Sequence, residues 1–98
     1  MPVTLINSFV IPPDQVDAFF ETWSQTARAI QSKPGFISAT LHRAVHDDAR
    51  FAFVNVALWE SEALYKAAFA KSPVPAGAVR PEAYPALYHV AAKFTPPS

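Results

Sequence analysis

Apolar side chains dominate two segments of the chain in a pattern typical of buried β-strands. Side chains alternate along a strand, so in residues 51–59, FAFVNVALW, one face carries Asn55 and Trp59 among apolar neighbours. Residues 3–11 repeat this design, with Asn7 as the polar interruption. The pattern therefore predicts two strands whose inner faces form an apolar chamber that contains one amide from each strand.

Two other segments have the spacing of amphipathic helices. The first is predicted to start at Asp14, a good N-cap that follows two prolines, and to end before the sequence Ser32-Lys33-Pro34-Gly35. A second helix is predicted over residues 62–71, with Ser61 as its N-cap. The apolar positions that define the first helix are Val16, Phe19, Phe20, Trp23, Ala27 and Ile30.

A third strand is predicted over residues 36–45, where Ile37 and Ala39 fall on one face. The polar residues 46–49 that follow are typical of a turn. We therefore expect this strand to fold back into residues 51–59 as a β-hairpin.

The end of the chain completes the predicted fold. Residues 72–85 contain four of the ten prolines and predict a long loop, and residues 86–94 supply a last strand. The resulting β-α-β-β-α-β order matches a ferredoxin-like α+β fold with an antiparallel four-stranded sheet. Its first and third strands are neighbours in the sheet centre, which is expected to bring Asn7 and Asn55 close together.

The composition favours a homodimer. The 98 residues are expected to form one domain, which has a small core, yet 51% of them are hydrophobic and only 16% charged. Two helices suffice to cover one face of the sheet, and the other face also carries apolar side chains, among them Ile6, Val54 and Val56. Sheet-to-sheet packing of two copies, with a barrel-like centre, would bury that second face.

Charge and residue usage argue against several classes of protein. The formal net charge is +0 and the basic residues form no stripe, so we expect no nucleic-acid partner. Cysteine is absent, which excludes thiolate catalysis and cysteine-zinc sites. No apolar run reaches the ~20 residues of a membrane span, and the N-terminus lacks the basic start of a signal peptide. The sequence thus predicts no membrane partner and a cytoplasmic location.

Four polar side chains are the candidates for chemistry in the chamber: Asn7, Asn55, Trp59 and Tyr65. Two interpretations are open. The amides either bond to each other or to a strand-edge carbonyl, or they face a ligand, and the rings either pack in the core or bind a ligand. The three histidines lack metal-ligand spacing and the two glycines form no phosphate loop. The chamber suits a flat aromatic ligand without a metal, with aromatic contacts from Phe9, Trp23, Phe53 and Phe69.

Four stretches in sequence order, VTLINSFVIPP, AFFETW, SKPGFISATLHR and ARFAFVNVALWES, resemble the antibiotic biosynthesis monooxygenase family, as does YPALYHV near the end. The resemblance implies a dimeric α+β barrel that oxidises polycyclic aromatic or quinol-type substrates with O2 and without a cofactor. The family's Asn, Trp and Tyr match Asn55, Trp59 and Tyr65, and its Arg would correspond to Arg80 in the proline-rich loop.

A haem-degrading branch of this superfamily is similar at Asn7 and Trp59, but residues 67–71 do not contain the histidine that would hold the iron. The resemblance therefore implies a cofactor-independent monooxygenase first. A non-catalytic ligand-binding or regulatory dimer is the alternative, and haem degradation comes third.

Overall fold

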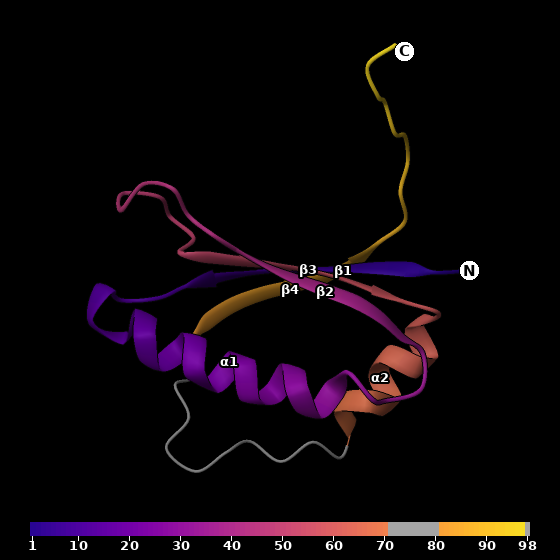
Figure 1. Cartoon of the computed structure of the whole chain (residues 1–98), viewed down its shortest axis with the longest axis horizontal. Coiled ribbons are helices and arrows are strands. Elements are labelled where there is room, and N and C mark those ends of the chain that lie inside the picture. The colour runs from indigo at the N-terminus through magenta and orange to yellow at the C-terminus, as the bar shows by residue number, and fades with distance from the viewer. Residues whose placement is uncertain (71–80, 98) are drawn as a thin grey trace.

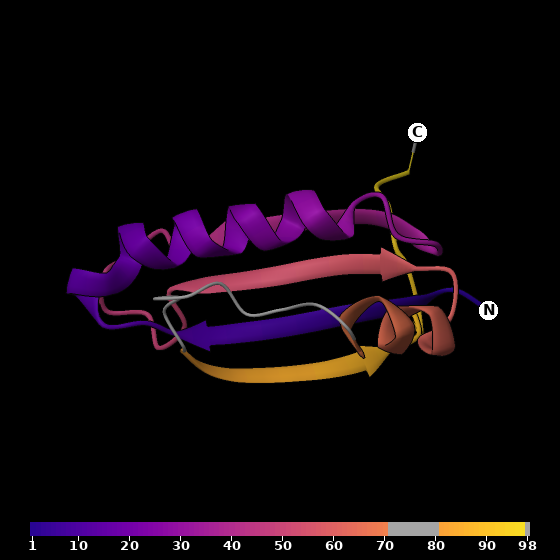
Figure 2. The same cartoon turned by 90° about the horizontal axis from the view of Figure 1, so that it is seen from below.

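A computed structural model describes residues 1–70 and 81–97, and Figures 1 and 2 show a twisted sheet with both helices on the same face. The fold is α+β, with a four-stranded antiparallel sheet in the order β2-β3-β1-β4, as the ferredoxin-like prediction requires. The elements are β1 (Val3–Val10), the short 3-10 turn η1 (Pro13–Gln15), α1 (Val16–Ile30), β2 (Phe36–Arg43), β3 (Phe53–Trp59), α2 (Glu62–Ala70) and β4 (Glu82–Tyr88).

The central pair of strands has the expected register. Asn7 of β1 lies directly opposite Asn55 of β3, so the two amides are cross-strand neighbours on one face. That face is turned toward the helices, because its other β3 side chains, Phe53, Ala57 and Trp59, are all buried. The prediction that the fold brings the two asparagines together is confirmed.

The last strand differs from the prediction. β4 occupies Glu82–Tyr88, so it begins inside the segment predicted as a loop and ends before Phe94. Pro85 argued against a strand, since proline cannot donate a ladder hydrogen bond. β4 is however an edge strand that pairs with β1 alone in the described sheet, and edge strands tolerate proline because their outer N–H groups need no partner.

Two local predictions are also wrong. α1 begins at Val16 after η1, and its N-cap residue is Gln15, without a side-chain cap, in place of Asp14. In β2, the sequence places Ile37 on the same face as Ala39, but a register shift between Phe36 and Ser38 turns Ile37 away from that inner face. Its side chain is 45% exposed. By contrast, Ser61 caps α2 as expected, because its Oγ accepts a hydrogen bond of 3.1 Å from the Leu64 N–H.

Two groups of side chains form the core between the sheet and the helices. Under α1, Phe19 packs against Phe9 and Phe53, with ring centroids 4.8 and 5.2 Å apart. Near α2, the second group centres on Trp59, which is 1% exposed. No helix in residues 1–70 and 81–97 is long and apolar enough to cross a membrane.

Candidate functional site

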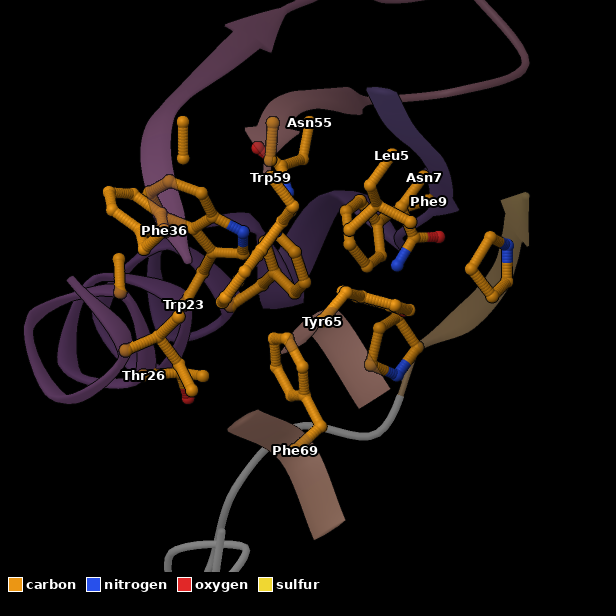
Figure 3. Close-up of a pocket in the computed structure, with 17 residues that line it drawn as sticks. Leu5, Asn7, Phe9, Trp23, Thr26, Phe36, Asn55, Trp59, Tyr65 and Phe69 are labelled. Atoms are coloured by element: carbon orange, nitrogen blue, oxygen red, sulfur yellow. The ribbon is translucent and has the colours of Figure 1, made fainter. Parts of the chain in front are cut away.

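A cavity of about 380 Å³ lies between the sheet and the two helices. Figure 3 shows side chains from the sheet and from both helices around it, among them Trp23 of α1, Asn55 of β3 and Tyr65 of α2. Its volume lies above the low end of ~300 Å³ for small-molecule pockets. The wall is mostly aliphatic and aromatic, and the described side chains in it that carry a polar atom are those of Asn7, Trp23, Thr26, Asn55, Trp59 and Tyr65.

The amide oxygens of Asn7 and Asn55 are both buried, although Asn7 as a whole is only partly buried. Within the described residues, Oδ1 of Asn7 and Oδ1 of Asn55 have no hydrogen-bond partner, although Asn55 is only 8% exposed. An unsatisfied buried polar group costs about 1–3 kcal/mol. Buried side-chain polar atoms normally have a partner in the protein or in ordered water. The structure thus disfavours the interpretation that these two amides only pair with each other, and favours the one in which they face a ligand.

Trp59 combines tight packing with a free donor. Its indole ring is enclosed by Phe36 at 5.3 Å, Tyr65 at 5.7 Å and Phe69 at 6.1 Å between ring centroids. Its Nε1–H is buried and finds no acceptor in the described part of the chain. A rigid indole with an unused N–H on a cavity wall is ready to donate a hydrogen bond to a ligand oxygen.

Tyr65 is the one titratable side chain among the described residues of the wall. Burial raises its pKa above the usual value of 10.0, so the phenol is protonated at neutral pH. It can donate a proton or a hydrogen bond, but it is not a strong base at that pH. The described wall therefore offers hydrogen-bond donors and acceptors in an apolar space, without a charged group.

The structure brings together most of the residues that the sequence proposes for the site. These are Asn7, Phe9, Trp23, Asn55, Trp59, Tyr65 and Phe69, all of which line the cavity. Their roles in chemistry stay predictions, because a shared wall establishes position and not activity.

Two proposed residues are not placed in the wall. Phe53 is 2% exposed and lies in the core under α1, between Phe19 and Phe20, so its side chain does not line the cavity. It shares a strand face with Asn55, but that face extends beyond the cavity. Arg80 lies outside the described residues.

The sequence did not identify Phe36, Thr26 and Pro85 as wall residues. Thr26 had a signal, since it stands three residues after Trp23 and so shares its helix face. Phe36 and Pro85 had no such signal in the sequence. The position of Phe36 depends on a bulge in β2, and that of Pro85 on a strand that forms although it contains proline.

Comparison with known proteins agrees with this architecture. The model of the antibiotic biosynthesis monooxygenase family matches residues 2–76. A search of the curated proteins found no significant match. Among solved structures, a protein of Shewanella loihica provisionally called a monooxygenase is 35% identical, with a TM-score of 0.83, over 94% of this chain and 96% of the other.

Two further structures are similar in fold. SnoaB, a cofactor-independent oxygenase from Streptomyces nogalater, is 26% identical, with a TM-score of 0.70, over 99% of this chain and 98% of its own. The haem degrader MhuD from Mycobacterium tuberculosis is 23% identical, with a TM-score of 0.71, over 95% of this chain and 99% of its own. Since the family model covers most of the sequence and the fold agrees, the chain belongs to the antibiotic biosynthesis monooxygenase family.

Proposed function

We propose that the protein is a cofactor-independent monooxygenase that oxidises a small polycyclic aromatic or quinol-type substrate with O2. The observation that carries this proposal is the set of buried polar atoms of Asn7, Asn55 and Trp59 that have no partner within residues 1–70 and 81–97 and lie in a mainly apolar cavity. A flat ring system with hydroxyl and carbonyl substituents would fill the cavity: its hydroxyl groups would donate to the two Oδ1 atoms, and one of its oxygens would accept from the Trp59 N–H. The likeness to SnoaB supports the same class of reaction.

The chemistry needs only the substrate and O2. A substrate such as an anthrone loses a proton from its CH2 carbon to give an electron-rich anion, which reduces O2. A C–O bond forms, the distal oxygen takes a proton, and the resulting hydroperoxide loses water to leave a carbonyl. One oxygen atom of O2 remains in the product and the other leaves as water.

The side chains of the wall have defined tasks in this scheme. The indole N–H of Trp59 and the amide N–H groups of Asn7 and Asn55 donate hydrogen bonds to the substrate oxygens and so stabilise the anion. The apolar wall keeps water from the reacting centre. Tyr65, which burial keeps protonated, supplies the proton to the peroxide oxygen.

The described wall contains no carboxylate or imidazole that could remove the first proton. We therefore infer that ionisation of the substrate itself controls this step. The rate should then rise with pH around the pKa of the substrate, and should shift when a substrate of different acidity is used.

Haem degradation is the weaker candidate. α2 contains no histidine, and none of the histidines in the described residues lines the cavity. MhuD shares the fold at an identity too low to carry its activity over. We expect haemin to bind weakly and to persist when a reductant is added in air.

We also propose that two copies pack through their helix-free sheet faces. Val54, Val56 and Leu58 of β3 lie on that face and are only partly buried. The tail, residues 89–97, leaves β4 on the same side (Figure 1) and carries Phe94, which is 92% exposed. A second copy would cover both the apolar face and the tail.

The test of the function is O2 uptake with anthrone-type and quinol substrates in the absence of added flavin, metal or nicotinamide. Trp59→Phe, which removes the N–H and keeps an aromatic ring, should lower kcat/KM by about 10- to 1000-fold. Loss of activity with a chelator would contradict the cofactor-independent mechanism. Tight binding of these substrates without turnover would instead identify a ligand-binding or regulatory dimer.

A further inference from the structure

The bulge at the start of β2 changes which side chain reaches the cavity. Phe36 pairs with Trp59 and Ser38 pairs with Leu58, so Ile37 is the extra residue. Beyond the bulge the register is regular, and Ala39 lies opposite Ala57 on the inner face. Simple alternation from Ala39 would place Ile37 inside. The bulge places Phe36 inside instead, where its ring lies edge-on to the indole of Trp59 at an interplanar angle of 85°.

The backbone before the bulge is fixed from two sides. Gly35 has φ 87°, a conformation that other residues rarely adopt. Its carbonyl oxygen accepts a hydrogen bond of 2.8 Å from the Glu60 N–H at the end of β3. A Cβ on Gly35 would lie 2.6 Å from the Cβ of Leu64, so α2 packs directly on this backbone. Phe36 therefore enters the cavity from a well-defined turn.

Phe36 completes the enclosure of the proposed donor. Tyr65 and Phe69 contact the indole of Trp59 from α2, whereas Phe36 contacts it from β2. Phe36 is partly buried against the same core group and also lines the cavity. One side chain thus contacts both the space open to a ligand and the ring whose N–H has no acceptor in the described part of the chain.

We propose that Phe36, turned inward by the bulge, determines the size of aromatic ligand that the cavity accepts and positions the indole of Trp59 toward it. This inference rests on the proposed function for the type of ligand. It adds a specificity-determining and positioning residue to that site. A smaller side chain at position 36 lengthens the cavity at the β2 edge, and a larger one shortens it.

The test compares Phe36→Ala and Phe36→Trp with the wild type, and Ile37→Ala is the matched control because its side chain is adjacent in sequence but lies outside the cavity. Dissociation constants are measured by calorimetry for hydroxylated two-, three- and four-ring arenes. Phe36→Ala should shift the preference toward four rings over three by about tenfold or more, the range expected when an apolar pocket gains or loses room. Phe36→Trp should shift it the other way, and Ile37→Ala should leave it unchanged.

A second readout needs no ligand. The indole N–H resonance of Trp59 should move in Phe36→Ala, because a ring that stands edge-on to the indole is lost, and should stay in place in Ile37→Ala. If Phe36→Ala does not fold, Phe36→Leu serves for both measurements. A ratio of three-ring to four-ring affinity that stays within twofold across the folded Phe36 variants would overturn the proposal.

The outcomes also separate this inference from the proposed function. Shifted affinity ratios without O2 uptake would support the role of Phe36 and contradict the oxygenase. O2 uptake with unchanged affinity ratios would support the oxygenase and contradict the role of Phe36. Failure of the wild type to bind any of these arenes would overturn both.

Discussion

Replacement of Asn55 by leucine should change stability and activity in opposite directions. Leucine has the same branching and number of heavy side-chain atoms as asparagine but no polar atoms, so it removes the buried Oδ1 that lacks a partner in the described structure. Leaving such a group unsatisfied costs about 1–3 kcal/mol. Water in the cavity can meet part of this need, so we expect the lower half of that range.

The expected result is a ligand-free Asn55→Leu protein that is more stable than the wild type by about 1 kcal/mol, which corresponds to roughly 4–8 °C in Tm for a domain of this size. In the proposed mechanism the same change removes an N–H donor from the developing anion. The value of kcat should therefore fall by about 10²- to 10³-fold. This combination is typical of a residue that is kept for function at the expense of stability.

The assays are urea unfolding and O2 uptake with an anthrone. Both proteins are unfolded at the same protein concentration, because dimerisation would make their stability concentration-dependent. Asn7→Leu and the double variant complete a thermodynamic cycle. Because the two amides do not satisfy each other's oxygens, the coupling should lie near the lower end of the ~0.5–3 kcal/mol found for neighbouring residues. A loss of more than 1 kcal/mol in Asn55→Leu would show that the amide is a satisfied core group. Full activity in that variant would show that Asn55 has no role in the reaction.

Three further predictions concern the fold. Gly35→Ala should destabilise the protein by at least about 1–2 kcal/mol in urea unfolding, because of its positive φ and the approach to Leu64; wild-type stability would refute this. Burial raises the pKa of Tyr65, so the stability that the neutral phenol contributes is complete below pH 10 and is lost as the pH rises above 10. Between pH 9 and pH 11, Tyr65→Phe should therefore lose less stability than the wild type. Equal losses of unfolding free energy in the two proteins would contradict this prediction. In sedimentation, Phe94→Asp should weaken the dimer at least tenfold and Val45→Asp, a change at an equally exposed side chain in the hairpin loop, should not; equal effects would argue against a role of the tail in the dimer.

The alternation of apolar and polar side chains along the sequence determined much of the fold. Two strands that are apolar on both faces must lie in the centre of a sheet, and the helical spacing of α1 must turn one face to that sheet. With the β-α-β-β-α-β order, these facts already place Asn7 and Asn55 side by side, as the register shows. The four residues Asn7, Asn55, Trp59 and Tyr65 could be selected in this way because each belongs to a regular element.

Other features depended on contacts between segments that are distant in the sequence. The strand Glu82–Tyr88 forms in spite of Pro85 because β1 offers it an edge, and no local pattern contains that information. The inward position of Phe36 depends on the extra residue in β2, and that residue can be recognised only from the pairing of β2 with β3. A shift of the register by one residue moves every side chain to the opposite face of the strand. Likewise, only the packing of both helices showed that the amide oxygens and the indole N–H face a cavity and have no partner among the described residues, since hydrogen-bond satisfaction is a property of the whole fold.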